Sequence, residues 1–205
     1  CTMDDIRKIT DPVRLHAIIE KLRESKKKLE VQLDLALRDE LTGLVRRGRF
    51  HEIVDATITH GYIPTSLIFA DLNGLKMFND NYGHEAGDSL LVQFAGFLQD
   101  ERKVLEQKGV TVVIGRMSGD EFVILLPYYS YDETCALMSV IKERLARRIF
   151  YIAGRITRIV AAMGAATIGE NCSTALDLLH KADLAMYEDK NEMHNANILT
   201  TVLEI

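Results

Sequence analysis

A short polar turn between two apolar runs near the middle of the chain is the strongest indication of its fold. Val110–Ile114 and Phe122–Leu126 are rich in β-branched and aliphatic residues, and the segment between them contains Ser-Gly-Asp-Glu. Two runs of this kind joined by a glycine-containing connection predict a β-hairpin with a tight turn. The turn then presents two adjacent acids, Asp120 and Glu121, at an exposed tip.

A further acid lies at the end of another predicted strand. Ser66–Asp71 is an apolar run typical of a buried central strand, and it ends in Asp71. Taken alone, Asp71 is a turn or helix cap or a ligand that faces a cleft, and Asp120 and Glu121 could form an ordinary polar turn. Neighbouring hairpin residues point in different directions, so one of these two acids is expected to join Asp71. Two strand-end carboxylates favour a Mg²⁺–nucleotide site, because Mg²⁺ takes one or two carboxylates together with phosphate oxygens.

The segment between this strand and the next long helix concentrates polar side chains and glycines. Lys76 can offset phosphate charge as a point cation. Asn79 offers an amide donor and an acceptor, and the Asp88 carboxylate can accept hydrogen bonds from an N–H edge. This combination suits a guanine base, which displays N–H donors beside oxygen and nitrogen acceptors. The alternative is a capped loop whose polar groups face solvent.

The composition is that of a globular protein. The chain has 205 residues, of which 47% are hydrophobic and 27% charged, enough for one domain with a full core and an appendage. Its net charge of −5 argues against non-specific nucleic-acid binding, which usually shows a basic face, so no nucleic-acid partner is expected. No apolar run approaches about 18 residues, so no membrane-spanning helix is predicted in this sequence, and no signal peptide is visible.

The three cysteines, Cys1, Cys135 and Cys172, lie far apart and show neither a metal-binding nor a disulfide spacing. A reducing cytoplasm is therefore the expected location, either for a cytoplasmic protein or for the cytoplasmic part of a membrane-anchored receptor. The chain begins at Cys1 without an initiator methionine. We interpret it as a fragment of a longer protein that carries an upstream sensor domain.

The first part of the chain, residues 1–38, is predicted to be an N-terminal signalling helix with a coiled-coil pattern. No glycine or proline interrupts residues 13–38, and a heptad repeat runs through them. The repeat has one lysine at a core position and extends over roughly three to four heptads, close to the minimum for a coiled coil. The helix is expected either to pair with a second copy or to pack on its own domain. The heptad seam consists of Leu15, Ile19, Leu22, Lys26, Leu29, Leu33 and Ala36.

Strands and helices alternate over the rest of the chain, residues 39–205. Their order, β-α-α-β-β-α-β-α-β, predicts a mixed sheet with helices on its faces. Asp88 is expected to cap a long helix, and Ser173 to cap the last one. The expected elements are helix Arg49–Thr59, strand Ser66–Asp71, a turn at Asn73-Gly74 followed by a short helical run to Asn81, a turn between Gly83 and Gly87, helix Ser89–Gln107, the hairpin 110–127, helix Asp132–Arg148, strands Phe150–Ala153 and Ile156–Thr167, helix Ser173–Lys190 and strand Ile198–Leu203.

Five motifs follow one another between about Asp39 and Asn195. They are Asp39-Glu-Leu-Thr-Gly-Leu44, Phe69-Ala-Asp71-Leu-Asn73-Gly-Leu-Lys76-Met-Phe-Asn79-Asp80, Tyr82-Gly-His84-Glu-Ala-Gly87-Asp88, Arg116-Met-Ser118-Gly119-Asp120-Glu121-Phe122 and Lys181-Ala182-Asp183-Leu-Ala185-Met-Tyr187-Glu-Asp-Lys190. In this order and spacing, the chain resembles the GGDEF domain of diguanylate cyclases, which condense two GTP into cyclic di-GMP. The resemblance implies an α/β (α+β) fold with a central mixed, mainly antiparallel sheet flanked by helices, nucleotidyl-cyclase or palm-like, preceded here by the N-terminal helix.

The resemblance implies a metal site at the two strand ends. Asp71 and Asp120 would bind Mg²⁺ or Mn²⁺, with the carbonyl oxygen of Leu72 as a further ligand. Glu121 would support metal binding or remove a proton. Phosphoryl transfer would proceed by positioning and charge neutralisation, and the metal would lower the pKa of the attacking 3′-hydroxyl.

The resemblance also implies the substrate contacts and the assembly. Each domain would hold one GTP, so two domains of a homodimer would meet at their active-site faces, brought together by the helix of residues 13–38. Lysines would contact the triphosphate, one of them, Lys76, acting in catalysis as well, and a polar pair would read guanine. The implied substrate-binding residues are Lys76, Lys190, Asn79, Asp88 and Gly119.

The chain departs from the family pattern at several positions. Ser118 replaces the first glycine of the hairpin motif, where glycine permits a positive φ and a close backbone approach. Arg46 stands where an asparagine is usual, and His194 stands where a phosphate-contacting arginine is common. Asn73 keeps an oxygen ligand where many members have a second aspartate.

Further departures and alternatives concern regulation and activity. The family's product-inhibition motif, Arg-x-x-Asp, would lie just before the hairpin, where Gly109 and Val112 stand instead, so no feedback inhibition through that site is expected. The main alternative to an active cyclase is a degenerate, non-catalytic module that binds GTP or a partner. A cyclase that also accepts ATP fits Asp88 less well, because a carboxylate suits the donors of guanine better. A purely structural oligomerisation domain leaves the clustered acids unexplained.

Overall fold

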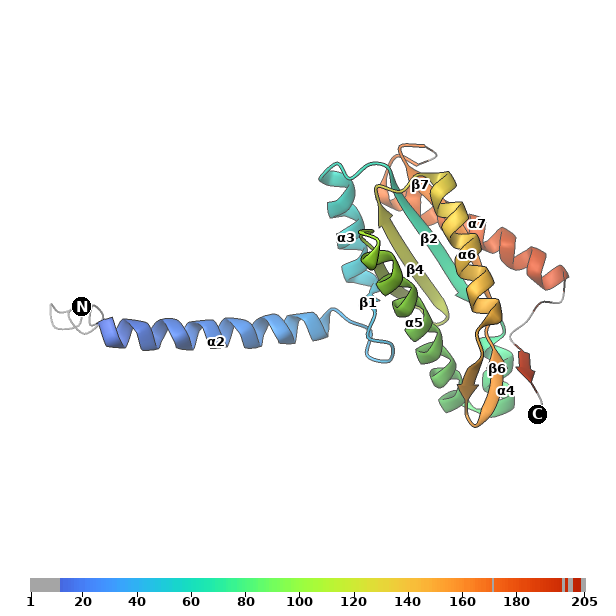
Figure 1. Cartoon of the computed structure of the whole chain (residues 1–205), viewed down its shortest axis with the longest axis horizontal. Helices are drawn as coiled ribbons and strands as arrows, with labels where there is room; N and C mark the ends of the chain where they lie inside the picture. Colours follow the sequence, from blue (N-terminus) through green and yellow to red (C-terminus); the bar gives the residue numbers. More distant parts are fainter. Residues whose placement is uncertain (1–11, 171, 197, 199–200, 204–205) are drawn as a thin grey trace. The chain divides into compact units, whose positions relative to one another are not determined.

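The computed structural model describes residues 12–170, 172–196, 198 and 201–203 (Figure 1). The chain divides into two compact units, Cys1–Arg38 and Asp39–Ile205. No helix in the described part of the chain is both long enough and apolar enough to cross a membrane.

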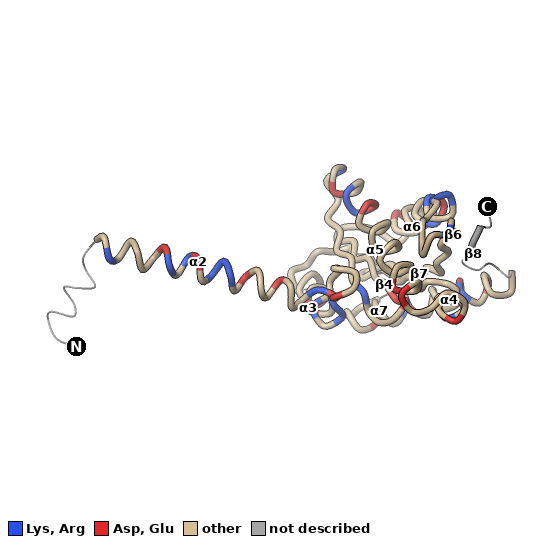
Figure 2. Tube along the Cα trace, turned by 90° about the horizontal axis from the view of Figure 1, so that it is seen from below, with Lys and Arg blue, Asp and Glu red and all other residues tan. Residues whose placement is uncertain are grey.

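The first unit contains one helix, α2, which extends over Pro12–Ala36. Every residue of α2 is exposed, including the heptad leucines Leu15, Leu22 and Leu29. Basic and acidic residues are interspersed along it (Figure 2). The predicted helix is therefore confirmed as a helix, and its apolar seam is exposed along the described residues. Its pairing with a second copy stays a prediction.

The second unit is built on a five-stranded sheet in the order β1-β3-β4-β2-β7. β1 pairs with β3 in parallel, and all other pairs are antiparallel, as expected for a mixed, mainly antiparallel sheet. The central strand β2 is buried along its whole length, because both faces of the sheet are covered. The strands are β1 Val45–Arg46, β2 Thr65–Leu72, β3 Val113–Ser118, β4 Glu121–Pro127 and β7 Ala161–Ile168.

Helices cover both faces of this sheet (Figure 1). Alternate residues of β2 point to opposite faces, so Ile68 packs with α4, α5 and α6, whereas Leu67 and Phe69 pack with α3 and α7. We call the second of these the α3–α7 face. The helices are α3 Arg47–Thr59, α4 Leu75–Tyr82, α5 His84–Gln107, α6 Tyr131–Arg147 and α7 Ala175–Asn195.

A small second sheet, in the order β5-β6-β8, corrects one strand prediction. The run Ile156–Thr167, expected to be one strand, is divided between β6 in the small sheet and β7 in the main sheet. Between them the carbonyl of Val160 accepts a hydrogen bond of 2.9 Å from the backbone N–H of Asn73. The run breaks because its two halves pair with different strands. The strands are β5 Phe150–Ile152, β6 Arg155–Arg158 and β8 Thr201–Leu203.

Two helix starts also differ from the sequence-based expectation. α5 begins at His84, directly after Gly83, whose φ of 86° and ψ of 162° separate it from α4. Gly87 therefore lies inside the helix, and Asp88 is not its cap. α7 is capped by the hydroxyl of Thr174, which accepts from the backbone N–H of Asp177 at 3.1 Å, and not by Ser173.

The hairpin begins later than expected. β3 starts at Val113, because the chain before it is still bonded to the end of α5, where the backbone N–H of Val110 donates to the carbonyl of Leu105. The turn itself is as predicted, with Gly119 and Asp120 joining Ser118 of β3 to Glu121 of β4.

Candidate active site

The acids of the hairpin lie beside the acid at the end of β2. Asp71 and Glu121 are register partners in the antiparallel pair of β2 and β4. The backbone N–H of Leu72 donates to the carbonyl of Asp120 at 3.1 Å, so the hairpin tip is held against the strand end. The fold thus gathers in one place the three acids that the sequence analysis selected from two distant segments.

Asp71 is buried, and its side chain is only 7% exposed. Burial raises the pKa of Asp71, Lys190 acts in the opposite direction, and the charges of Asp120 and Glu121 raise it further. The Nζ of Lys190 donates to Oδ1 of Asp71 at 2.7 Å. A positive charge beside Asp71 opposes this rise in pKa, and Lys190 supplies it.

The position of Lys190 depends on its neighbour Asp189. Lys142 of α6 donates to both carboxylate oxygens of Asp189 at 2.7 Å, and the backbone N–H of Met163 in β7 donates to Oδ2 at 2.8 Å. These bonds fasten the C-terminal half of α7 to α6 and β7. The next residue, Lys190, is thereby held over Asp71.

Lys190 also lines a small cavity of about 130 Å³ with Asn73, Gly74 and His194. The resemblance implied phosphate contacts at Lys190 and at the position of His194, and the fold places the two together. Lys76 lies in the first turn of α4 and is exposed. Within the described residues it forms no ion pair, and it is not among the residues around this cavity.

The two residues expected to read a base lie on two helices that pack together, Asn79 on α4 and Asp88 on α5. A Cβ at Gly87 would lie 1.7 Å from Oδ1 of Asn79, so the Asn79 amide occupies the space that glycine leaves. This Oδ1 atom is buried and has no hydrogen-bond partner within the described residues. Asp88 follows Gly87 and is exposed. Sequence reasoning took Gly87 for a turn residue, because a glycine inside a helix is uncommon.

An ion pair between Arg116 and Asp39, which the sequence analysis did not predict, holds the hairpin turn in place. Nη1 of Arg116 donates to Oδ1 of Asp39 at 2.9 Å, while its Nε and Nη2 donate to the carbonyl of Gly119 at 3.0 and 2.7 Å. Burial alone would raise the pKa of Asp39, but hydrogen bonds from Thr42 and Arg116 hold it below its ordinary value. The sequence did contain an indication of this ion pair, because Asp39 and Arg116 are each the first residue of one of the five motifs.

Ser118, the departure from the hairpin motif, fits without backbone strain. It ends β3, and its φ is not positive, whereas Gly119 has a φ of 36°. The Ser118 hydroxyl donates to Oε2 of Glu121 at 2.5 Å. The glycine that the turn requires is therefore the second one, which the chain retains.

The donor set at the strand ends is compatible with Mg²⁺. Within the described part of the chain, no three or more His, Cys, Asp or Glu side chains are gathered tightly enough to bind a metal by themselves. Mg²⁺ usually takes only one or two carboxylates, with phosphate oxygens and water completing its shell. Asp71 with one of the two hairpin acids supplies that number, and the repulsion between these carboxylates favours a bound cation.

Comparison with known proteins agrees with this architecture. Residues 36–196 match the family model described as diguanylate cyclase, GGDEF domain. The chain is 31% identical over 177 residues to the probable diguanylate cyclase DgcE of Escherichia coli, covering 85% of this chain and 16% of DgcE. It is 31% identical over 189 residues to the diguanylate cyclase DgcP of the same organism, covering 89% and 52%. The chain thus spans at most about half the length of these relatives.

Solved structures show the same fold. A sensory box/GGDEF family protein of Caulobacter crescentus has a TM-score of 0.65 at 28% identity, covering 76% of this chain and 99% of that one. The coiled coil and GGDEF domain of DgcB from the same organism has a TM-score of 0.74 at 21% identity, covering 88% and 94%, which is a likeness of fold. By its family match, its relatives and its sheet topology, the chain belongs to the GGDEF domain family of diguanylate cyclases.

Proposed function

We propose that this chain is an active diguanylate cyclase that condenses two GTP into cyclic di-GMP, with Mg²⁺ as its cofactor, in a homodimer whose active sites face each other. The observation that carries the proposal is the meeting of Asp71, Glu121 and Lys190, which come from three different elements. This arrangement favours an active domain over a degenerate one, because it keeps the carboxylates and the cation that metal and phosphate binding require.

The nucleotide is held by groups on either side of these acids. Asn79 and Asp88 pair with the base, the buried and unpartnered Oδ1 of Asn79 accepting from guanine N–H groups. Lys190 and Lys76 contact the triphosphate. Asp71 and Asp120 would hold the divalent ion, and Lys190, which pairs with Asp71 in this structure, would then contact the triphosphate. Lys190 would thereby pair with Asp71 when no metal is bound and contact the phosphates when GTP is bound.

The chemical step is a phosphoryl transfer carried out twice. The 3′-oxygen of one GTP forms a bond to the α-phosphorus of the other, the bond from that phosphorus to the oxygen of the β-phosphate breaks, and pyrophosphate leaves. The hydroxyl proton passes to Glu121, which the Ser118 hydroxyl orients. Mg²⁺ supplies Lewis-acid stabilisation of the charge on the α-phosphate when it is bound. Asp71, Asp120 and the lysines position the reactants and balance their charge.

Two copies are needed because each domain holds one GTP. The exposed heptad seam of α2 is suited to bring two chains together, since a helix of this kind buries its apolar side only by pairing. An upstream sensor domain in a longer protein would act through the same helix.

The test is the conversion of GTP to cyclic di-GMP by the purified chain with Mg²⁺, followed by mass spectrometry over a range of protein concentrations. We expect product, with a rate per chain that rises with concentration. Asp120→Asn should lower the rate roughly 100-fold, equivalent to about 2.7 kcal/mol of transition-state stabilisation. Asp132→Asn, which changes an exposed carboxylate in the first turn of α6, should leave it unchanged.

Two results would contradict the proposal. Binding of GTP by the dimeric wild-type chain without any cyclic di-GMP would indicate a non-catalytic GTP-binding module. Full activity in Asp120→Asn would remove the metal role assigned to the hairpin.

A further inference from the structure

The C-terminal half of α7 carries the residues that line the phosphate cavity from the side of this helix. Lys190 and His194 are four residues apart, one helical turn, and both line the cavity. Between them, the Sδ atom of Met193 accepts a hydrogen bond of 3.3 Å from the side-chain amide of Asn73. The side chain of Lys190 is 40% exposed and has a flexible stem, so its place beside Asp71 depends on how α7 itself is held.

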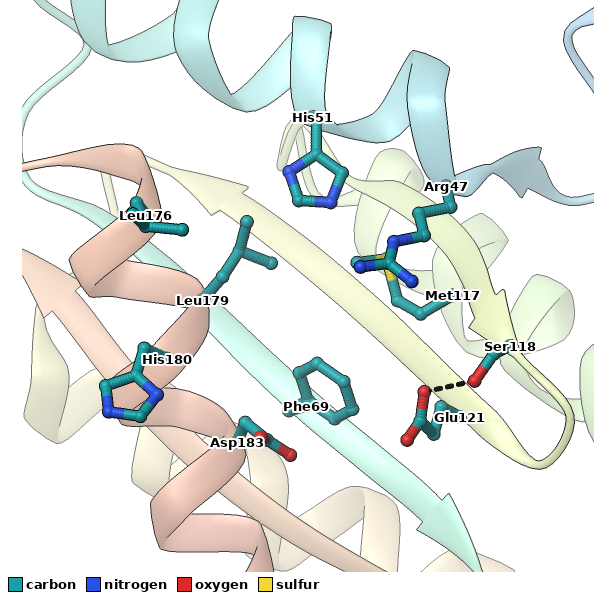
Figure 3. A pocket seen from close by; sticks show the side chains of 10 residues that line it. All are labelled: Arg47, His51, Phe69, Met117, Ser118, Glu121, Leu176, Leu179, His180 and Asp183. Carbon is teal, nitrogen blue, oxygen red and sulfur yellow. Dashed lines mark hydrogen bonds between the residues drawn. The ribbon is translucent and has the colours of Figure 1, made fainter.

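α7 is open to a cleft on the side that faces α3. The cleft has a volume of about 460 Å³ and lies between the two helices over β2 and the hairpin. In Figure 3, Arg47 and His51 of α3 face His180 of α7 across this space. The contacts that set the position of α7 lie instead against the sheet, mainly along β7.

α7 approaches β7 most closely at a glycine. A Cβ at Gly164 would overlap the backbone nitrogen of Met186 and lie 2.7 Å from the carbonyl oxygen of Ala182, so the backbones of helix and strand are in direct contact. Ala182 and Met186 belong to the buried stripe of α7. Two helical turns after Ala182, the same side of the helix presents Asp189. A carboxylate that continues a buried apolar stripe needs polar partners.

Asp189 finds these partners around the edge of the sheet. β7 is the last strand in the order of the main sheet, and its Met163 donates a backbone N–H to Oδ2 of Asp189 at 2.8 Å. Lys142 donates to both carboxylate oxygens from α6, a helix that covers the opposite face of the sheet. The ion pair therefore connects the two layers of helices past the edge of β7. Its side chains are only 26% and 23% exposed, so solvent screens it less than a fully exposed pair.

Two points of attachment on α7 determine the direction of Lys190. Contact at Gly164 alone would leave α7 free to rotate or tilt about that point. The bonds of Asp189, three residues after Met186, remove this freedom. Successive helical residues are about 100° apart around the axis, so a rotation of α7 that releases Asp189 also carries Lys190 away from Asp71.

We propose that Lys142 and Asp189 are positioning residues for the phosphate contact of Lys190. Their ion pair around the sheet edge fixes the C-terminal half of α7, and both residues act on the nucleotide through Lys190. The proposal rests on the proposed function and gives α6, on the other face of the sheet from α7, a part in substrate binding. Loss of the pair should weaken the phosphate contact and leave the base site on α4 and α5 unchanged.

The experiment compares the affinities of the full chain for two probes. One is a GTP analogue whose α–β bridging oxygen is replaced by methylene, with Mg²⁺, and the other is guanosine, which has no phosphate. Calorimetric titration measures the first affinity and ligand-observed NMR the second, so no turnover is required. Asp189→Asn and Lys142→Met should each lower the affinity for the analogue roughly tenfold, or about 1.4 kcal/mol, and leave that for guanosine unchanged. Lys142→Arg keeps the charge and should retain most of the affinity for the analogue.

Two further variants test whether the effect passes through Lys190. Arg144→Met is the matched control, because Arg144 lies two residues after Lys142 on α6 and pairs with Glu101 of α5 at 2.8 Å. It should bind both probes as the wild type does. In a Lys190→Met background, Asp189→Asn should cause no further loss of affinity for the analogue, because residues that act through one contact are not additive.

The possible results separate the two proposals. Equal losses of affinity for the analogue and for guanosine in Asp189→Asn would indicate general support of the fold and overturn the positioning role. An unchanged affinity for the analogue, or a further loss in the Lys190→Met background, would overturn it as well. A chain that shows the expected selective losses but makes no cyclic di-GMP from GTP would contradict the proposed activity alone.

Discussion

At the scale of single residues, the two neighbouring positions 118 and 119 of the hairpin motif differ in backbone conformation. Ser118 ends a strand with an ordinary backbone conformation, whereas Gly119 has a positive φ. A side chain is tolerated at the first position and strained at the second, because L residues are disfavoured in the left-handed region. The departure at Ser118 is thus compatible with an intact turn.

Exchanges at these two positions should therefore have unequal effects. Ser118→Gly, which restores the family residue, should change cyclase activity by less than about fivefold, or ~1 kcal/mol. Gly119→Ala should destabilise the fold by about 1–2 kcal/mol and lower activity more strongly. Turnover assays and urea unfolding of both variants check this. Equal behaviour of the two variants would mean that the turn conformation does not decide activity.

Gly87 is a second glycine that the fold requires, because its missing side chain leaves the space that the Asn79 amide occupies. Gly87→Ala should push Asn79 out of place and weaken GTP binding by roughly tenfold, or about 1.4 kcal/mol. Gly96→Ala is the matched control in the same helix, because a Cβ there would meet nothing within 4 Å. It should stabilise α5 by up to about 1 kcal/mol and leave GTP affinity unchanged. Calorimetric titration and thermal unfolding distinguish the two, and equal GTP affinities would refute the positioning role of Gly87.

At the scale of elements, the ion pair of Asp39 and Arg116 connects the segment before β1 to the hairpin. Asp39→Ala should destabilise the second unit by about 1 kcal/mol, because Arg116 and Thr42 lose a charged acceptor. Asp39→Asn keeps an oxygen for Thr42 and should cost less. Thermal unfolding of the variants gives the order of the effects, and an unchanged melting temperature in Asp39→Ala would contradict the prediction.

The contribution of Asp39 should also depend on pH in one direction. Its pKa is lower in the folded chain than in the unfolded chain, so the ionised form is the one that stabilises the fold. The stabilisation is complete above the unfolded pKa of about 4 and is lost as pH falls through the lowered folded pKa. Stability curves of wild type and Asp39→Asn should therefore converge in acid, and a constant difference between them would refute this account.

The elements also show what the sequence could and could not predict. β2 was found from its apolar run, because a strand covered on both faces leaves that pattern. The division of Ile156–Thr167 was not found, because nothing in the run marks a change of pairing strand. The ion pair of Lys190 with Asp71 joins residues 119 positions apart, and no local pattern encodes such a contact. The sequence motifs therefore indicate the acids of the site, whereas only the folded structure shows that Lys190 pairs with Asp71.

At the scale of the whole molecule, activity is expected to depend on the association of two chains. Leu22→Lys with Leu29→Lys removes apolar side chains from the heptad seam of α2 and should weaken self-association by at least about tenfold. The rate per chain should then fall at low protein concentration and recover at high concentration. Val31→Lys alters an exposed apolar residue of α2 outside the seam and serves as the control. Sedimentation and turnover measured together test this, and unchanged association of the double variant would exclude the seam.

The contact between Lys190 and Asp71 has a consequence for the order in which the site is loaded. A buried carboxylate without a cation destabilises a fold, but here the protein carries its own counter-ion. The chain should therefore fold and persist without any divalent ion, and chelators should leave its melting temperature unchanged. Under the proposed function, a divalent ion bound at Asp71 would replace the positive charge of Lys190, so that loading of the site would exchange one counter-ion for another.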